Sequence, residues 1–329
     1  MVRNCRLKEA RSEMNSRLFF LGILFFLLTP DATIGALEKV TVSHSVRGSL
    51  SVGPLLYGIH RDFYREEGIE LLYVSIRADL GIKALLAGEV DYIYSVGTAI
   101  RGAVQGVPVK ALSFDFIKVF HSLMARPEIA SAAALKGKRV AVSSFGASTD
   151  LSARVALQAM GLDPTRDVTI VALGGDTIRY AALQAGTVQA AMMSLPLNIR
   201  LKKEGYTELF YAGKILHEPL TGLVTSTEKI KRNPDQIHRM MRAFVRGMQA
   251  FKAERAGFVS FAQKKFGLTK DVTEEAYEYL IDSLSQDGFA QPVVVERAIE
   301  SAKKLVRSDK PVSQADIVDY TFLRAALKK

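Results

Sequence analysis

The chain contains almost no cysteine, because Cys5 is the only one among 329 residues. It lies ahead of an apolar run near the N-terminus, so a chain cleaved after that run carries no thiol. Disulfides, cysteine-ligated metals and cysteine nucleophiles are therefore excluded from the remaining residues. The same absence removes the cysteine to which a membrane-tethered lipoprotein attaches its lipid.

The motifs of common catalytic sites are also absent. The five histidines do not form an HExxH motif or any other close metal-ligand spacing. The nearest approach to a GxSxG nucleophile elbow, Gly146-Ala147-Ser148, lacks the closing glycine. The phosphate-binding pattern GxxxxGK[ST] does not occur. We therefore expect no catalytic residue, no bound metal and no cofactor, and predict that the protein is not an enzyme.

Tryptophan is missing, and the formal charge of +10 comes from 44 basic and 34 acidic residues. Many of the basic residues lie within 229–265, a stretch with helical periodicity, where such side chains usually form a solvated face. No basic-aromatic motif accompanies them, so we expect no nucleic-acid binding. The excess charge favours anionic solutes.

The N-terminus has the pattern of a secretory signal peptide. Leu18–Leu28 is an apolar run of 11 residues, which is too short to span a bilayer, and basic residues precede it. The small residues Gly35 and Ala36 offer a cleavage point. We predict a cleavable signal peptide over 1–36 and a periplasmic mature protein. Initiation at Met1 or at Met14, and an uncleaved anchor, remain open.

Strand patterns alternate with helix patterns over most of the remaining chain. This alternation indicates an α/β fold with parallel, doubly wound sheets. The expected strands are 39–44, 69–76, 90–95, 107–114, 138–143, 168–173, 188–193 and 208–213, and the expected helices between them include 52–67, 80–87, 99–105, 176–185 and 197–203.

The alternation runs twice, which predicts two lobes. A short repeat links the halves, since ALLAGEVD at 84–91 matches ALQAGTVQ at 182–189. Beyond about 230 only helices are expected, with start or turn signals at Asn233-Pro234-Asp235, Thr269 with Asp271, Gln291-Pro292 and Lys310-Pro311. We assign 37–122 plus 222–329 to lobe I with the C-terminal helices, and 123–221 to lobe II.

Ligands of open parallel sheets bind beyond the carboxyl ends of the strands, where helix N-termini present unpaired N–H groups. The loop after the strand 138–143 has hydroxyl side chains around a glycine, which suits such contact, although helix capping explains one or two of them. The predicted ligand residues of this loop are Ser144, Gly146, Ser148 and Thr149.

Equivalent loops follow the other strands. Arg47 could clamp an oxyanion, and the alternative is an exposed turn arginine. Asp176 is either a ligand contact or a helix cap, and Asp115 could bind an amine. The predicted ligand residues of these loops are Ser45, Arg47, Ser49, Ser95, Gly97, Thr98, Asp176 and Ser194.

Three segments together resemble a known family. These are GPLLYGIHRDFYREEGIELLYV (53–74), ALLAGEVDYIYSVGTAI (84–100) and LKGKRVAVSSFGASTD (135–150). They resemble the periplasmic solute-binding proteins of ABC transporters of the nitrate, sulfonate and taurine type, in the thiamine-pyrimidine-synthase-like superfamily. The resemblance spans about residues 38–262. The cysteine-rich motif of the eukaryotic pyrimidine synthases is absent, which argues against their chemistry.

The resemblance implies a two-lobe periplasmic-binding-protein fold of type II, the Venus-flytrap fold. Its lobes would close over one small polar, anionic or sulfonate-like solute and deliver it to a membrane permease with its ATPase. The family's ligand loops fall on Ser45–Ser49, Ser95–Thr98, Ser144–Thr149 and around Ser194. We expect a monomer. The alternative is a periplasmic enzyme or a ligand-gated sensor partner on the same scaffold.

Overall fold

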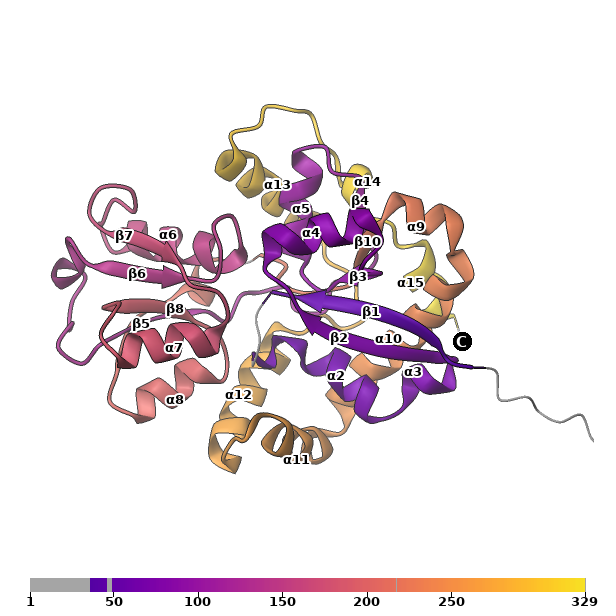
Figure 1. The fold of residues 1–329 in the computed structure, drawn as a ribbon, viewed down its shortest axis with the longest axis horizontal. Helices are drawn as coiled ribbons and strands as arrows, with labels where there is room; N and C mark the ends of the chain where they lie inside the picture. Colours follow the sequence, from indigo (N-terminus) through magenta and orange to yellow (C-terminus); the bar gives the residue numbers. More distant parts are fainter. Residues whose placement is uncertain (1–35, 46–48, 217, 329) are drawn as a thin grey trace, which may run out of the picture. The chain divides into compact units, whose positions relative to one another are not determined.

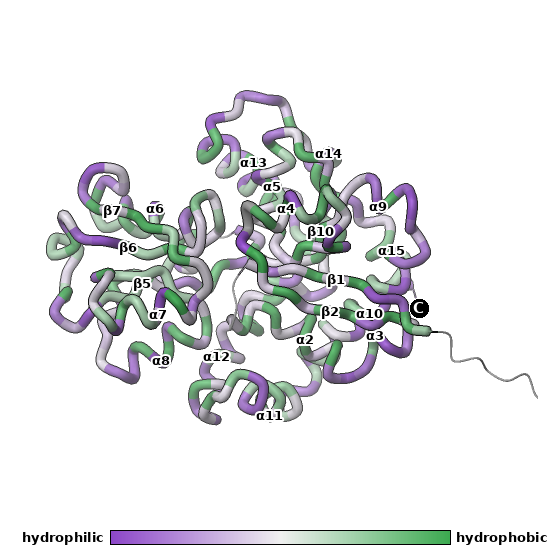
Figure 2. The backbone as a smooth tube through the Cα atoms, viewed as in Figure 1, coloured by the Kyte–Doolittle hydropathy of each residue, from purple (hydrophilic) through white to green (hydrophobic). Residues whose placement is uncertain are grey.

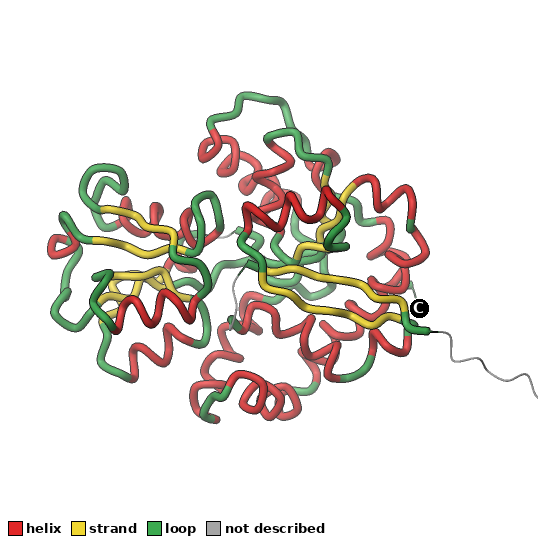
Figure 3. Tube along the Cα trace, in the orientation of Figure 1, coloured by secondary structure: helices red, strands yellow, loops and turns green. Residues whose placement is uncertain are grey.

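The structure is a computed structural model and describes residues 36–45, 49–216 and 218–328. The predicted signal peptide (1–36, with its cleavage point) therefore lies almost wholly outside the described residues, as does Arg47. Residues 37–329 form one compact unit. Strands and helices alternate along it and build two five-stranded sheets flanked by helices (Figures 1 and 3).

The first sheet has the strand order β2-β1-β3-β10-β4. Strand β1 pairs in parallel with β2 and β3, whereas β10 is antiparallel to β3 and β4. The strands are β1 (Glu38–His44), β2 (Ile69–Ser75), β3 (Tyr92–Ile93), β4 (Val109–Ala111) and β10 (Val224–Ser226).

The second sheet has the order β7-β6-β8-β5-β9. Strand β6 is parallel to β7 and β8, and β5 is antiparallel to β8 and β9. The strands are β5 (Ser122–Ala125), β6 (Arg139–Val142), β7 (Thr169–Ala172), β8 (Ala190–Met193) and β9 (Thr207–Tyr211).

Both sheets are thus mixed rather than parallel throughout. The antiparallel strands β10 and β5 are the ones that the chain forms after passing from one sheet to the other. Each enters its sheet without a preceding crossover helix on that sheet, so the rule that makes βαβ strands parallel does not apply to it. The expectation of parallel sheets is corrected at these two strands.

The helices that follow the strands of the first sheet are η1 (Leu50–Val52), α2 (Gly53–His60), α3 (Phe63–Glu66), α4 (Ala78–Ala87) and α5 (Val96–Val104). The continuous helix expected over 52–67 is broken between α2 and α3, where Asp62 has a left-handed φ of 57°. Helix α5 begins earlier than expected, so Gly97 and Thr98 belong to its first turn rather than to a loop.

The second sheet is flanked by η2 (Ala133–Leu135), α6 (Ser148–Ala159), α7 (Asp176–Gln184), α8 (Leu197–Lys203) and η3 (Ala212–Lys214). Helices α7 and α8 lie close to the expected positions. Strand β7 is followed by α7 after only three residues, so the N-terminus of α7 lies beside the carboxyl end of the sheet.

The C-terminal part is helical, as expected. It consists of α9 (Thr227–Arg232), α10 (Pro234–Ala253), α11 (Arg255–Phe266), α12 (Lys270–Ser283), α13 (Pro292–Val306), α14 (Gln314–Ile317) and α15 (Thr321–Leu327). Three start signals are confirmed at α10, α12 and α13. Lys310-Pro311 precedes a loop instead, and α14 begins after Ser313, whose side chain forms a capping box with Asp316.

Helix α10 organises the largest hydrophobic cluster. Its apolar face recurs at helical spacing through Ile237, Met240, Phe244 and Phe251, all fully buried. The cluster also includes residues of β1, α2 and α8, so the interior is continuous between the two sheets. Figure 2 shows hydrophobic residues along β1 and β2, beside which α2, α3 and α10 lie. Among the described residues, no helix combines the length and apolarity needed to cross a membrane.

Candidate functional site

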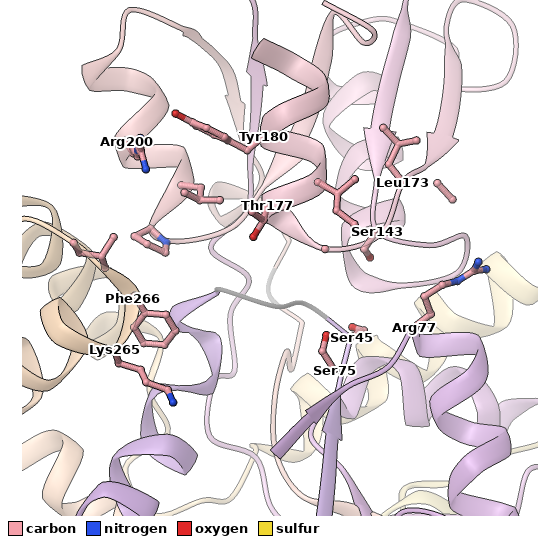
Figure 4. Close-up of a pocket in the computed structure, with 17 residues that line it drawn as sticks. Ser45, Ser75, Arg77, Ser143, Leu173, Thr177, Tyr180, Arg200, Lys265 and Phe266 are labelled. Atoms are coloured by element: carbon pink, nitrogen blue, oxygen red, sulfur yellow. The ribbon is translucent and has the colours of Figure 1, made fainter. Parts of the chain in front are cut away.

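A cavity of about 900 Å³ lies at the carboxyl ends of strands from both sheets (Figure 4). This is the place where open α/β sheets bind ligands. Its volume is within the range of small-molecule sites. Seventeen described residues line it, from the first sheet, the second sheet and the end of α11.

The first sheet contributes polar side chains. Ser45 directly follows β1, Ser75 ends β2, and Arg77 precedes the first residue of α4. Adjacent parallel strands end at one edge of a sheet, which brings Ser45 and Ser75 together although thirty residues separate them in the sequence. Figure 4 places both serines on the same side of the cavity.

The second sheet supplies most of the remaining lining. Ser143 follows β6, and the short segment after β7 leads into α7, whose first turns carry further lining residues. The loop between β8 and α8 adds another group. The lining residues of this sheet are Ser143, Ala172, Leu173, Gly174, Gly175, Thr177, Ile178, Tyr180, Pro196, Leu197 and Arg200.

The third contribution comes from the C-terminal helices. Lys265 and Phe266 end α11, and Leu268 follows it. The cavity is therefore enclosed by segments from three separate parts of the sequence. In Figure 4, Arg200 lies on the wall that the second sheet forms, Lys265 and Phe266 lie below it at the left of the view, and Arg77 lies at the right.

The charged side chains of the cavity lining are all basic, and one of them, Arg200, pairs with Glu204 outside the lining. The lining includes Arg77, Arg200 and Lys265, and none of the described lining residues is a carboxylate. Thr177 and the serines add hydroxyl groups that can donate hydrogen bonds. Such a cavity favours a ligand with negative charge and hydrogen-bond acceptors.

Of the predicted ligand residues that follow β1, one lines the cavity and another is buried away from it. Ser45 lines the cavity. Ser49 is fully buried, and its hydroxyl accepts a hydrogen bond from Ser51 N at 3.2 Å, so it caps η1. Arg47 lies outside the described residues.

The predicted residues around α5 lie in a buried polar cluster rather than in the cavity lining. Ser95 Oγ donates to Thr98 Oγ1 at 3.0 Å, and Arg101 donates to the same hydroxyl at 3.4 Å. Two segments connect the sheets, the first between β4 and β5 and the second between β9 and β10. Gly97 packs against the second connecting segment, since a Cβ at this position would lie 3.3 Å from the carbonyl oxygen of Pro219.

Most polar groups of the loop before α6 form hydrogen bonds within the loop and with the start of the helix. Thr149 Oγ1 accepts from Ser143 N at 3.0 Å and lies 2.7 Å from Ser143 Oγ. Gly146 has φ of +74° and donates its N–H to Asp150 at 2.9 Å. Ser148 begins α6, and the buried Ser144 hydroxyl has no hydrogen-bond partner among the described residues.

Asp176 and Ser194 form part of a buried network behind the cavity wall. Asp176 makes an ion pair with Arg179, and both side chains are fully buried. Asp176 Oδ1 also accepts from Ser194 N at 3.2 Å, and Arg179 Nε donates to Met192 O at 2.9 Å. Burial raises the pKa of Asp176, and the neighbouring Arg179 charge opposes that rise. The negative charge of Asp176 is thus neutralised within the protein.

Several lining residues were not predicted. Arg77 follows β2, so the argument that selected the other strand ends would also have found it. Tyr180 and Arg200 lie inside helices α7 and α8, and Lys265 and Phe266 lie at the end of α11. Basic and aromatic residues are common on the surfaces of helices, so their presence there does not indicate a ligand site. Only the tertiary structure brings them to the cavity.

We searched the described residues for side chains that would form a catalytic or metal site. The described residues contain no cluster of three or more histidine, cysteine or carboxylate side chains that would hold a metal. His44 is buried, with its Nε2 3.4 Å from Ser51 Oγ.

The comparisons with solved structures define the class of fold. The alkanesulfonate-binding protein SsuA from Xanthomonas axonopodis pv. citri, bound to MOPS, has a TM-score of 0.69 and 17% identity, with 88% of this chain and 97% of that chain covered. The periplasmic nitrate-binding protein NrtA from Synechocystis PCC 6803 has a TM-score of 0.71 and 12% identity, with 89% of each chain covered. A Candida albicans protein described as having the generic periplasmic binding protein fold has a TM-score of 0.70 and 13% identity, with 87% and 97% covered.

The protein thus has the two-lobe α/β fold of periplasmic binding proteins with a helical C-terminal region, as expected from the sequence. Residues 50–255, more than half of the chain, match the family model described as NMT1/THI5 like. The chain belongs to this family. A search of curated protein sequences gave no match.

Proposed function

We propose that the protein is the extracytoplasmic substrate-binding component of an ABC transporter, which captures a small polar, anionic or sulfonate-like solute and delivers it to a permease. The family and the fold support a solute-binding role. The names of the neighbours support the solute class, because one is described as alkanesulfonate-binding and another as nitrate-binding.

The observation that carries this proposal is the composition of the cavity. Arg77, Arg200 and Lys265 come from three different segments and are brought to one space without a lining carboxylate among the described residues. Basic side chains around one space attract an anion, and a ligand that binds the folded protein but not the unfolded chain stabilises the fold. Twelve residues were predicted from the sequence as ligand contacts, and of these Ser45 lies in this lining.

The proposed mechanism is closure of two lobes over the solute. We assign 37–122 plus 222–329 to lobe I and 123–221 to lobe II, with the connecting segments as the hinge. A solute that contacts both lobes binds the closed form more tightly and shifts the equilibrium towards it. The permease, with its ATPase, would recognise that form.

Periplasmic location follows in this proposal from the predicted signal peptide over 1–36 and is supported by the neighbours described as periplasmic. We expect a monomer and no nucleic-acid partner. A binding protein differs from an enzyme on the same scaffold in that it returns its ligand unchanged.

Native mass spectrometry of the freshly purified protein, followed by identification of the released molecule, tests the proposal. We expect one small anion per chain, and small-angle X-ray scattering should show a lower radius of gyration when it is added back. A bound molecule that is chemically converted by the protein would contradict the transport role, and a radius of gyration unchanged by bound solute would contradict closure.

A further inference from the structure

A second cavity, of about 500 Å³, lies where α11 packs against α2. Figure 1 shows these two helices side by side. Both belong to the part of the chain assigned to lobe I, so the proposed closure of the lobes would leave the shape of this cavity unchanged. Its volume is within the range of small-molecule sites. It shares one lining residue, Lys265, with the cavity described above.

The floor of this second cavity is aromatic. Tyr57 and His60 lie one turn apart on α2, and Phe261 lies on α11. The His60 ring stacks on that of Phe261, with the ring centres 4.8 Å apart and the planes at 26°. The centre of the Tyr57 ring lies 5.9 Å from that of His60 and 5.6 Å from that of Phe261. His60 is exposed and Phe261 is half-buried, so a further ring can join this cluster.

The aromatic wall is held in place by contacts outside the cavity. The Tyr57 hydroxyl donates to Glu254 Oε2 at 2.7 Å, and Arg61 forms an ion pair with the same carboxylate. Gly257 lets α11 approach this hydroxyl, since a Cβ at that position would clash with it. The charge of Glu254 is thus already paired, and the wall is formed before a ligand arrives. A preformed site loses little conformational freedom on binding.

The charged residues of this lining are both basic. Lys264 and Lys265 lie at its edge, Ser260 adds a hydroxyl, and none of the described lining residues is a carboxylate. Both lysines are exposed, and neither forms an ion pair with a described residue. Lys264 follows Phe261 by three residues, so its ammonium group and the Phe261 ring share one face of α11. A charged group attached to a stacked ring can therefore reach this ammonium.

We propose that the cavity between α2 and α11 is a second ligand site, which binds a planar aromatic carboxylate. The ligand ring stacks on the cluster of His60, Phe261 and Tyr57, and its carboxylate is bound by Lys264, with Lys265 beside it. This site does not depend on the proposed function, since its aromatic floor and Lys264 do not line the first cavity.

Titration of the purified, ¹³C-histidine-labelled protein at constant pH, followed by NMR, tests this inference. The readout is the ring signal of His60, which is assigned by its absence in His60→Gln. The probes are 1-naphthoate, naphthalene-1-methanol, which lacks the charge, and cyclohexanecarboxylate, which lacks the aromatic ring. We expect 1-naphthoate to shift the His60 signal saturably, and the other two to bind at least about threefold more weakly. Added salt should weaken the binding of 1-naphthoate and leave that of naphthalene-1-methanol unchanged.

Two substitutions separate the charge from the ring. Lys264→Gln should weaken 1-naphthoate binding about threefold, with Lys264→Arg close to the wild type. Lys270→Gln is the matched control, because Lys270 is 73% exposed and lines neither cavity. It should leave the affinity unchanged. Phe261→Leu removes the ring, keeps an apolar side chain in the same place, and should weaken 1-naphthoate binding about fivefold.

The inference is overturned if 1-naphthoate leaves the His60 signal unshifted, if either of the other probes binds as tightly, or if Lys264→Gln and Lys270→Gln have equal effects. Arg200→Gln separates the two cavities, because Arg200 lines only the first. The His60 shift should persist in this variant, and its loss would place the probe in the first cavity and overturn the second site. A failure of anion capture in the first cavity would leave the His60 titration unchanged, so the two proposals fail separately.

Discussion

His121 Nδ1 lies 2.8 Å from Ser152 Oγ, and both side chains are buried. The contact joins the first connecting segment, just before β5, to helix α6. Burial lowers the pKa of His121 to about 3, and the positive charge of Arg179 adds to this effect. The imidazole is therefore neutral in the folded protein and becomes protonated when the chain unfolds in acid.

His121 should make the protein acid-sensitive. Between about pH 6.5 and pH 3 the unfolded chain binds a proton at this site that the folded chain does not. The free energy of unfolding should therefore fall as the pH is lowered through this window, by about 1.4 kcal/mol per pH unit. Urea unfolding at pH 7, 5.5 and 4 should show a smaller loss for His121→Gln than for the wild type. Identical losses in both proteins would contradict this prediction.

Asp115 should give the opposite dependence. It is fully buried, its Oδ1 accepts from Phe116 N at 2.9 Å, and its Oδ2 has no partner among the described residues. Burial raises its pKa to about 7. The folded protein therefore binds the proton more tightly than the unfolded chain, whose aspartate titrates near pH 4. Stability is fully present below that pH and is lost as the pH rises to about 7, by roughly 4 kcal/mol at most.

Asp115→Asn should consequently be more stable than the wild type at pH 8 and should differ little from it at pH 4. Thermal melting at the two pH values measures this difference. The result also reports on the link between the two connecting segments, because Asp115 N donates to Thr221 O at 3.1 Å. A variant that is equally destabilised at both pH values would show that the carboxylate is needed in its charged form.

The buried ion pair between Asp176 and Arg179 should be required for stability rather than for binding. Removing one partner leaves the other charge buried and unpaired, so Asp176→Ala should cost about 3–5 kcal/mol. Arg166→Ala is a suitable control, because the Arg166 side chain is 82% exposed and its solvent-screened pair with Asp163 should contribute little to stability. Guanidinium unfolding measures both. Equal costs would show that burial of the pair is not decisive.

Gly222 in the second connecting segment should not tolerate a side chain. Its φ is +154°, and a Cβ would lie 2.0 Å from the carbonyl oxygen of Ser113, which is backbone and cannot turn aside. Gly222→Ala should therefore lower stability by several kcal/mol, on the order of an overpacked core. Gly137→Ala, at φ of +70° with no atom within 4 Å of the added Cβ, should cost only about 1 kcal/mol. Comparable melting temperatures for the two variants would contradict the steric argument.

The positions of most strands and helices could be predicted from the sequence, because the alternation of strand and helix patterns along the chain is local and is retained in the folded protein. Eight of the strands lie where alternation with helices placed them, and α10 begins at the Pro234 signal. The other two strands, β5 and β10, are not among the eight expected ones. Their residues, Ser122–Ala125 and Val224–Ser226, are all buried and follow connecting segments without an α-helix. A short buried strand has no alternation of polar and apolar residues to identify it.

The candidate site was predictable only in part. Sequence reasoning pointed to the carboxyl ends of the strands. Ser45, which was predicted, lines the cavity there, and so do Ser143 beside Ser144 and Thr177 beside Asp176. It could not tell a hydroxyl that faces a ligand from one used internally, as Thr149 is by Ser143. It also could not place Arg200 or Lys265, whose approach to the cavity depends on how α8 and α11 pack.

The end of α11 has a consequence for how solute preference can change. Lys265 and Phe266 at the end of α11, and Leu268 just after it, line the cavity from a part of the chain that belongs to neither sheet. Substitutions there would remodel one wall while the β-strands keep their register. A small combinatorial library over these three positions would therefore be an economical way to change which compound the cavity binds.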